Sequence, residues 1–415
     1  MKKKTNILYV HYGDDWIRGS EQCLIDLISH LDQQRFVPFV WTNNPALVPF
    51  LEEADIEYQL DTFPLLLGWT SPKMDVTHWL ALVKKGRQLI QRYNISLVHA
   101  NSGAPCQWMA LAARLSQCPL VTHLHSDYQA RDRVTLGLHL SPHVITASDA
   151  ISQSLREDGY PQSKLSVVHN GVNVAKLSVQ PEVDVRQRLG LQPEDTVYTT
   201  VGSLIARKGV DRIIQALRYL TLEYPNSHLV VVGDGEQKNQ LIQLCEQLHL
   251  SKNVHFVGEQ HNVAGWLKGS DAFVSGARQE AFGLVVAEAA VAGTPIIAPF
   301  EGGIPEIVQH GESALLYVNQ GYTPLLDMMR CIHSHKEQCL TLAQRAKKTV
   351  EQQFNHRRYV SEVEAIYDEL LEQTAQQPPC LLSGLKPLKT AFGKRIKSRY
   401  PDTKFPRLRR TRWEV

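Results

Sequence analysis

Short apolar runs rich in β-branched residues alternate with helical patterns along most of the chain, and this alternation restricts the possible folds more than any other feature. The runs lie at 6–12, 36–43, 97–101, 119–125, 144–148 and 164–168, and again at 197–203, 228–234, 254–258, 272–276, 295–299 and 313–318. Strands separated by helical segments of ten or more residues pair in parallel, and helices then cover both faces of the sheet. The sequence therefore predicts an α/β fold with two parallel sheets.

A stretch in which the apolar pattern is broken separates the two series of strands. Pro181, Pro193 and several charged residues interrupt the pattern within 175–195. We therefore expect two Rossmann-like domains, residues 1–174 and 196–353, joined by a linker, and 415 residues are a natural length for two domains. Because open α/β sheets bind ligands at the carboxyl ends of their strands, a ligand site is predicted in a cleft between the domains.

The composition fits a chain with a sizeable core and indicates no metal-binding or disulfide framework. Hydrophobic residues make up 43% and charged residues 21% of the sequence. The seven cysteines are scattered without a C-x-x-C pair, which argues against disulfides and against a zinc site. The N-terminus has no pattern of a signal peptide, and no apolar run is long enough to span a bilayer, so we expect a cytoplasmic location.

The net charge of +2 hides a strongly basic C-terminal tail. Residues 378–415 hold eleven Lys and Arg against Asp402 and Glu414, a net charge of +9, which leaves −7 on the remainder. Apolar residues recur at helical spacing in this tail: Leu385, Leu388, Phe392, Ile396 and Tyr400. The pattern predicts a basic amphipathic helix on an anionic membrane surface, and not a nucleic-acid site; a solvated tail is the alternative. Segment 65–87 is a second candidate contact, or ordinary core.

Two glutamates eight positions apart, Glu280 and Glu288, carry the strongest chemical signal. Glu280 comes just before a glycine that opens a helix, and Glu288 lies within that apolar helix. A glutamate on an apolar segment is costly to bury unless it has a hydrogen-bonding partner, and a ribose diol is a natural one. The helix start, with Phe282, Gly283 and Leu284, offers free backbone N–H groups and a positive dipole end, which suit a diphosphate. The segment therefore predicts a site for a nucleoside diphosphate.

This pair resembles the E-x7-E motif of the retaining family-4 glycosyltransferases (glycosyl transferases group 1), and other signatures of the family follow in the right order. The similar segments are Gly202–Asp211, Val232–Gly235, Asn170–Asn173 and Gly302–Val308. The resemblance covers about residues 5–372. It implies the GT-B fold, in which two Rossmann-like domains face each other across a cleft and a C-terminal helix, here 354–377, crosses back to the first domain.

The resemblance also implies roles for the residues of the donor site. Glu280 is expected to contact the donor sugar and Glu288 the ribose, while Arg207 and Lys208 stabilise the charge on the leaving diphosphate. The alternative for the two cations is a solvated pair on a turn. Ser203 lies in the donor loop where many members of the family have arginine. The adjacent cations make this loop most similar to that of the lipopolysaccharide-core glucosyltransferases.

Two further segments belong to the first domain. His125, after a buried-looking strand, matches a histidine that the family places near donor sugar and acceptor; a core histidine is the alternative. His123 lies on the same face of the strand, and we assign it to the core. Gly19 and Ser20 resemble the family's glycine-rich first loop, which approaches phosphate or acceptor hydroxyls. The sequence has no D-x-D triplet, so neither a metal nor another cofactor is expected.

The hypothesis from the sequence is a retaining glycosyltransferase, acting on a lipid-linked or cell-envelope glycan of the lipopolysaccharide, capsule or exopolysaccharide type and bound peripherally to the cytoplasmic membrane. Its expected partners are a nucleotide sugar, a glycolipid or glycan acceptor and an anionic membrane, and the sequence indicates no oligomeric state. Two alternatives stay open: a sugar-nucleotide epimerase or hydrolase on the same fold, and a non-catalytic nucleotide-sugar binding protein.

Overall fold

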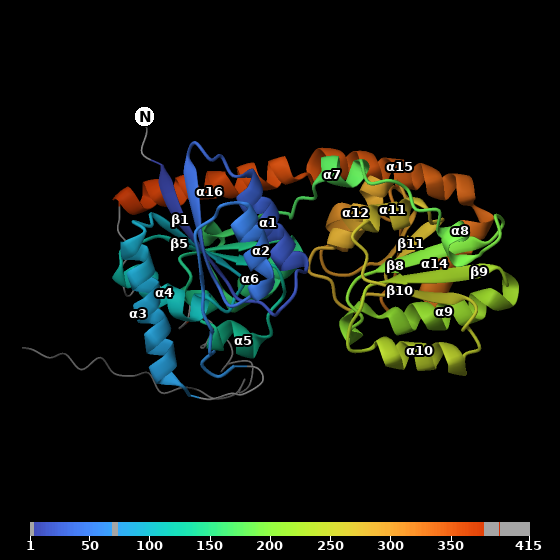
Figure 1. Ribbon diagram of the computed structural model, residues 1–415, viewed down its shortest axis with the longest axis horizontal. Coiled ribbons are helices and arrows are strands. Elements are labelled where there is room, and N and C mark those ends of the chain that lie inside the picture. The colour runs from blue at the N-terminus through green and yellow to red at the C-terminus, as the bar shows by residue number, and fades with distance from the viewer. Residues whose placement is uncertain (1–3, 69–73, 377–389, 391–415) are drawn as a thin grey trace, which may run out of the picture.

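The computed structural model describes residues 4–68, 74–376 and 390, and in it the chain forms two α/β domains side by side (Figure 1). The first domain has a parallel sheet in the order β3-β2-β1-β4-β5-β6-β7, and the second a parallel sheet in the order β10-β9-β8-β11-β12-β13. The predicted fold class, two Rossmann-like sheets with C-terminal helices that contact the first domain, is confirmed.

The strands of the first sheet are β1 Thr5–His11, β2 Phe36–Thr42, β3 Tyr58–Leu60, β4 Leu97–Asn101, β5 Leu120–Leu124, β6 His143–Thr146 and β7 Leu165–Val167. Its helices are α1 Gly19–His30, α2 Val48–Glu53, α3 Val76–Arg92, α4 Cys106–Leu115, α5 Ala130–Thr135 and α6 Asp149–Asp158. Strand β3 was not predicted from the sequence. It is an edge strand that pairs only with the end of β2, and its apolar residues are separated by Gln59 and flanked by Glu57 and Asp61, so they form no apolar run.

The strands of the second sheet are β8 Thr196–Val201, β9 Ser227–Val232, β10 Val254–Gly258, β11 Ala272–Val274, β12 Ile296–Pro299 and β13 Leu315–Tyr317. Its helices are α9 Val210–Glu223, α10 Lys238–Gln247, α11 Val263–Lys268, α12 Leu284–Ala292, α13 Ile304–Ile307, α14 Thr323–Ser334 and α15 Lys336–Gln353. Short helices α7 Val174–Ser178 and α8 Val185–Leu189 lie in the segment expected to be a linker.

Helix α16, His356–Gln376, returns to the first domain along the edge that Figure 1 shows at the top. Its buried residues pack into the apolar core beside β1 and α1. The hydroxyl of Tyr367 lies 3.1 Å from that of Tyr9 and 2.7 Å from Nδ1 of His99. A buried apolar contact with such polar bonds inside it fixes α16 to this domain.

The chain crosses between the domains at two points that lie against each other. Val172 donates its N–H to the carbonyl of Phe354 at 2.8 Å, and His356 donates to the carbonyl of Val172 at 3.1 Å. A Cβ at position 171 would lie 2.5 Å from the Cα of His356, so only glycine allows this approach. The predicted Asn170–Asn173 signature therefore has a packing role at the crossing.

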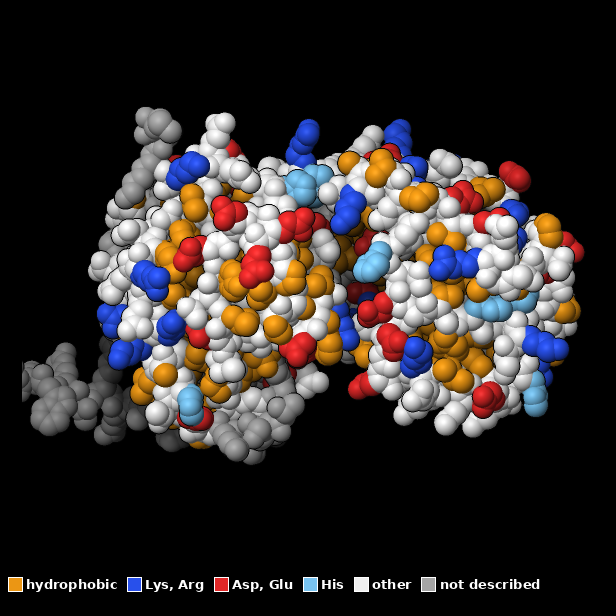
Figure 2. Space-filling view, in the orientation of Figure 1, with side chains coloured by type: hydrophobic (Ala, Val, Ile, Leu, Met, Phe, Trp, Pro, Cys, Tyr) orange, Lys and Arg blue, Asp and Glu red, His pale blue; other side chains and the backbone are white. Residues whose placement is uncertain are grey.

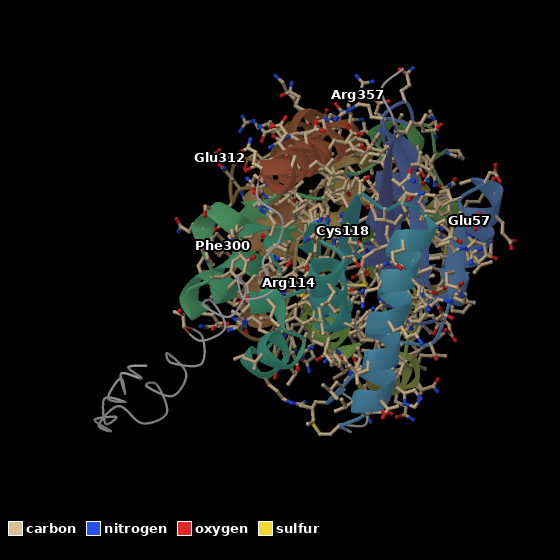
Figure 3. The ribbon with its side chains drawn as sticks, turned by 90° about the vertical axis from the view of Figure 1, so that its left-hand side faces the viewer. Glu57, Arg114, Cys118, Phe300, Glu312 and Arg357 are labelled. Carbon is tan, nitrogen blue, oxygen red and sulfur yellow. The ribbon has the colours of Figure 1, made fainter. Side chains whose placement is uncertain are left out.

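Figure 3 looks at the outer end of the first domain, where α3 runs beside α4. Arg114, labelled there, is buried, and its guanidinium donates to the backbone carbonyls of Ala110 and Leu140. This cation has a structural role. In the part of the chain that the structure describes, no helix is both long and apolar enough to cross a membrane. The basic tail 378–415 lies outside the described residues except for Thr390.

Candidate functional site

An open cleft of about 880 Å³ lies between the domains, at the carboxyl ends of the strands. Its first-domain wall is formed by 12–21, Ser102, Ala104, 125–126, Tyr128 and Asn170, and its second-domain wall by 201–203, 207–208, 232–234, 259–261, Val263 and 280–285. The space-filling view shows this hollow with acidic and basic side chains around it (Figure 2). The cleft is large enough for a ligand with several groups.

Two predicted residues meet on the second-domain wall. Nζ of Lys208 lies 2.6 Å from Oε2 of Glu280, and the side chains are 22% and 13% exposed. Lys208 comes from the turn after β8, and Glu280 comes from the loop before α12, so the fold joins residues 72 positions apart. In the free protein each neutralises the other, and both line the cleft, where a phosphate and a sugar hydroxyl would compete for them.

The loop that holds the two predicted cations is braced by a residue that the sequence analysis missed. Arg278 forms a bidentate ion pair with Asp211 at 2.8 and 2.6 Å, and it also donates to the carbonyl of Ala206 at 2.8 Å. Its N–H donates to the carbonyl of Arg207 at 2.8 Å. The side chain of Arg207 is exposed at the cleft and donates to the carbonyl of Gln279 at 3.3 Å. Ser203 also lines the cleft.

Two helices begin at the cleft and lie against each other there. Helix α12 begins after Gly283, whose φ of 111° lies in the left-handed region that favours glycine, and α1 begins at Gly19. A Cβ on Gly19 would lie 3.2 Å from the side chain of Leu284. Free N–H groups and two positive helix ends thus face the same space, which suits a diphosphate. Phe282 also lines the cleft, but its ring is 2% exposed and packs near Phe354 and His169.

Glu288 lies one helical turn inside α12 and is not among the residues that line the cleft. Burial raises the pKa of Glu288 to about 7; the carboxylate of Asp26 on α1 adds to the rise, and Lys208 opposes it. The structure thus brings Glu280 and Lys208 into direct contact, whereas Glu288 faces α1 at the back of the site. An incoming diol would have to reach this deeper carboxylate.

His125 ends a chain of buried polar groups on the first-domain wall. Its Nε2 lies 2.9 Å from Oδ1 of Asn101, whose amide lies 3.0 Å from Nδ1 of His11, and Nε2 of His11 lies 2.9 Å from Glu21. An amide oxygen only accepts, which assigns the hydrogen of His125 to Nε2 and leaves Nδ1 as an acceptor.

Burial, with a smaller effect from His11, lowers the pKa of His125 to about 4, against the opposing effects of Glu21 and a hydrogen bond with Asn170. His125 is therefore neutral near pH 7 and accepts hydrogen bonds at Nδ1. His123 is fully buried away from the cleft, between His99 and Tyr359. His11 and Asn101 were not predicted from the sequence, because buried polar residues within strands carry no local signal.

Ser20 has a backbone role in this wall. Its carbonyl accepts from the Asn101 amide at 3.2 Å, and its hydroxyl donates to Glu21 at 3.0 Å. These bonds fix the first turn of α1 next to the chain that ends at His125. Among the described residues, no three His, Cys, Asp or Glu side chains are grouped so as to hold a metal ion.

A carboxylate of the second domain also holds the two domains together beside the site. Glu306 of α13 accepts from the backbone N–H groups of Asp149 and Ala150, at 2.9 and 3.0 Å, at the start of α6. It also lies 2.7 Å from Nε2 of His169. Gly302, two residues before α13, fits against the carbonyl of Glu280, where a Cβ would approach to 1.6 Å. The interdomain contact and the donor loop are therefore neighbours.

Comparison with known families agrees with this geometry. The model of "Glycosyl transferases group 1" matches residues 183–349, and that of "Glycosyltransferase Family 4" matches residues 17–176. The chain belongs to this family of glycosyltransferases, and it is a retaining transferase that uses a nucleotide-sugar donor.

Individual relatives cover most of the chain at low identity. N-acetyl-alpha-D-glucosaminyl L-malate synthase of Bacillus anthracis is 27% identical over 303 residues, 70% of this chain and 79% of the relative. The solved structure of Anabaena Alr3699/HepE in complex with UDP is 24% identical and aligns with a TM-score of 0.75 over 88% of this chain and all of that one. The lipopolysaccharide outer core galactosyltransferase WaaB aligns at 16% identity with a TM-score of 0.68, over 88% of this chain and 100% of that one. These structures confirm the fold.

Proposed function

We propose that this glycosyltransferase moves a hexose from a UDP-linked donor to a glycan of the cell envelope. The names of similar proteins support the donor: one solved relative is in complex with UDP-glucose, and the Bacillus relative attaches an N-acetylglucosaminyl group. The acceptor class is supported by WaaB and WaaG, two structural neighbours of lipopolysaccharide biosynthesis, and by the sequence of the donor loop. For this chain, these names support only the class of acceptor, a glycan of the cell envelope, and no individual acceptor.

The observation that carries the proposed mechanism is the Lys208–Glu280 pair at the junction of two helix starts. The diphosphate of the donor would bind Lys208, Arg207 and the N–H groups at the helix starts, and so break the ion pair between Lys208 and Glu280. The Glu280 carboxylate could then accept hydrogen bonds from the donor sugar. As the glycosidic bond breaks, negative charge grows on the diphosphate, and the same cations stabilise it. The carboxylate of Glu288 would bind the ribose.

We infer that the acceptor attacks from the face that the diphosphate leaves, which retains the configuration in a single step. The acceptor hydroxyl forms the new bond to the anomeric carbon, the bond to the phosphate oxygen breaks, and the departing phosphate takes the hydroxyl proton. Neutral His125 holds a hydroxyl at Nδ1 and exchanges no proton. No residue of the chain needs to act as a nucleophile in this scheme.

A panel of radiolabelled nucleotide sugars tests the proposal. Purified protein is incubated with each donor and with lipid and glycan fractions of the cell envelope, and the products are separated into free sugar, altered sugar nucleotide and glycan. Label in the glycan from a UDP-hexose is the expected result. Label only in free sugar or in an epimer would refute transfer to a glycan.

We also propose that the protein works in the cytoplasm at the inner face of the membrane, held by the basic tail 378–415. Its charge of +9 and its apolar repeat support this. Segment 65–87 remains a second candidate. Trp79 of α3, in that segment, is partly buried, and its indole donates to the carbonyl of Gln107 at 3.0 Å, so its ring is held to the domain.

A further inference from the structure

The loop between β1 and α1 is held rigid on the first-domain wall of the cleft. The side chain of Asn43 both accepts from the N–H of Gly13, at 3.0 Å, and donates to its carbonyl, at 2.8 Å. Fully buried Asn44 donates to the carbonyl of Trp16 at 2.9 Å. Two successive side chains at the end of β2 thus fix both ends of the segment 13–16, so its exposed side chains are preorganised.

Trp16 presents its ring at this wall. The side chain is 42% exposed, whereas Trp41, Trp108 and Trp266 are fully buried. The guanidinium carbon of Arg18 lies 3.8 Å from the centre of the Trp16 ring, so a cation covers one face. Trp16 also lines the cleft. A fixed indole that stays open to a cleft is a surface for a flat, weakly polar partner.

The charges beside Trp16 restrict the chemistry of that partner. Asp14 and Asp15 are exposed and line the cleft, and Arg18 is stacked on the indole. Carboxylates accept hydrogen bonds from hydroxyl groups and repel phosphate or carboxylate. The C–H groups of a pyranose ring carry partial positive charge and suit the negative face of an aromatic ring. An uncharged sugar fits both features, whereas an anionic group could be attracted by Arg18 but would be repelled by the two carboxylates.

The opposite wall also has carboxylates, Asp234, Glu259 and Glu280, but there two cations, Arg207 and Lys208, lie beside the start of α12. The diphosphate of the donor therefore belongs on that wall, and the first-domain loop is left for the second substrate. We propose that Trp16, with Asp14 and Asp15, binds a neutral sugar ring of the acceptor. This inference rests on the proposed function and deepens it, because it names the chemical class of the group next to the reaction.

The experiment uses the full chain labelled with 15N-tryptophan and saturated with UDP. Trp16→Phe assigns the indole N–H signal of Trp16. The probes are methyl glycosides of glucose, galactose, mannose and N-acetylglucosamine, each compared with its 6-phosphate. The expected result is a saturable shift of this signal by at least one neutral glycoside, with at least tenfold weaker binding of its 6-phosphate. The double variant Asp14→Asn with Asp15→Asn should reduce the difference in affinity between the neutral glycoside and its 6-phosphate.

Kinetics provide the second measurement. Trp16→Ala should lower kcat/KM for the responding glycoside at least tenfold and affect the Kd for UDP much less. Tyr219→Ala is the matched control, because Tyr219 is 44% exposed and stacked on Tyr322 outside the cleft.

Three results would overturn the inference. The first is that no neutral glycoside shifts the Trp16 signal. The second is that the 6-phosphate binds as tightly as the neutral glycoside. The third is that the signal responds only to UDP-glucose, which would make the loop part of the donor-sugar site. Failure of the proposed function is a separate result. It would appear as wild-type protein that neither binds nor cleaves any UDP-sugar.

Discussion

Removing the amine of Lys208 tests the proposed donor site most directly. The Lys208 and Glu280 side chains are 22% and 13% exposed, so the 2.6 Å ion pair is mostly buried, with its open side toward the cleft. Lys208→Ala would leave the Glu280 carboxylate without its partner. Loss of one group that stabilises developing charge typically costs about 3–4 kcal/mol, a factor of about 10² to 10³ in kcat. We expect a loss of this size, and a smaller rise in the KM of the donor.

The cost in stability should be smaller than the cost in catalysis. Breaking a buried, hydrogen-bonded charge pair costs about 2–5 kcal/mol, but Glu280 lines an open cleft from which water can reach it. We therefore expect a loss of about 1 kcal/mol, seen as a decrease in Tm of a few degrees. Lys336→Ala is the control, because Lys336 also forms an ion pair, with Asp271 at 3.3 Å, but its side chain is exposed and lies away from the cleft.

The assay follows the release of UDP in single-turnover and steady-state experiments with the donor that the panel identifies. Unchanged kcat with a raised donor KM would show that Lys208 stabilises the bound donor and the transition state equally, and not the developing charge in particular. Normal turnover by the double variant Arg207→Ala with Lys208→Ala would refute the assignment of both cations.

The other predictions concern the deeper carboxylate, the tail and the crossing point. Glu288→Gln should weaken UDP binding about tenfold, since the charged bonds to ribose are lost; equal affinity by calorimetry would contradict the ribose role. Because the folded protein raises the pKa of Glu288 to about 7, stability should fall as pH rises from about 4.5 through 7, and thermal denaturation should show less of this fall in Glu288→Gln. UDP affinity should rise over the same range, and Asp26→Asn should move that rise to lower pH. Deleting 378–415 should release the protein from anionic liposomes without abolishing turnover on a soluble acceptor, and binding by full-length protein should weaken as salt rises; equal sedimentation of both forms would place attachment elsewhere. Gly171→Ala should cost about 2 kcal/mol or more in chemical denaturation, because its Cβ meets backbone atoms of His356; an unchanged midpoint would mean that the crossing yields easily.

The fold could be predicted because its signals are local. Each apolar run is read from its own residues. Strand β3 was missed because Tyr58 and Leu60 are separated by Gln59 and flanked by Glu57 and Asp61, so they form no such run. The placing of Lys208 and Glu280 in one donor site was reached only through the resemblance to a family, because two loops 72 residues apart have no local relation, and their direct contact was not predicted.

Supporting residues were harder to predict than those of the site itself. Arg278 supports the cation loop through Asp211, and Asn101 connects His125 to His11. Each of these bonds joins elements that are distant in sequence, so a pattern along the chain does not contain them. Trp16 was missed for another reason. In a sequence a tryptophan indicates core, and only the folded loop leaves it exposed.

The return of α16 makes the second domain an insertion in the first. The chain leaves the first domain next to Val172 and comes back at Asn355, and these residues form a bridge with each other. An insertion with adjoining ends can be exchanged as a cassette, so the donor half of a relative could be grafted here through two neighbouring junctions. The same topology decides which half a C-terminal anchor would hold. The tail continues from α16, so an anchored tail would fix the acceptor half to its surface, and the donor half would be the part that moves.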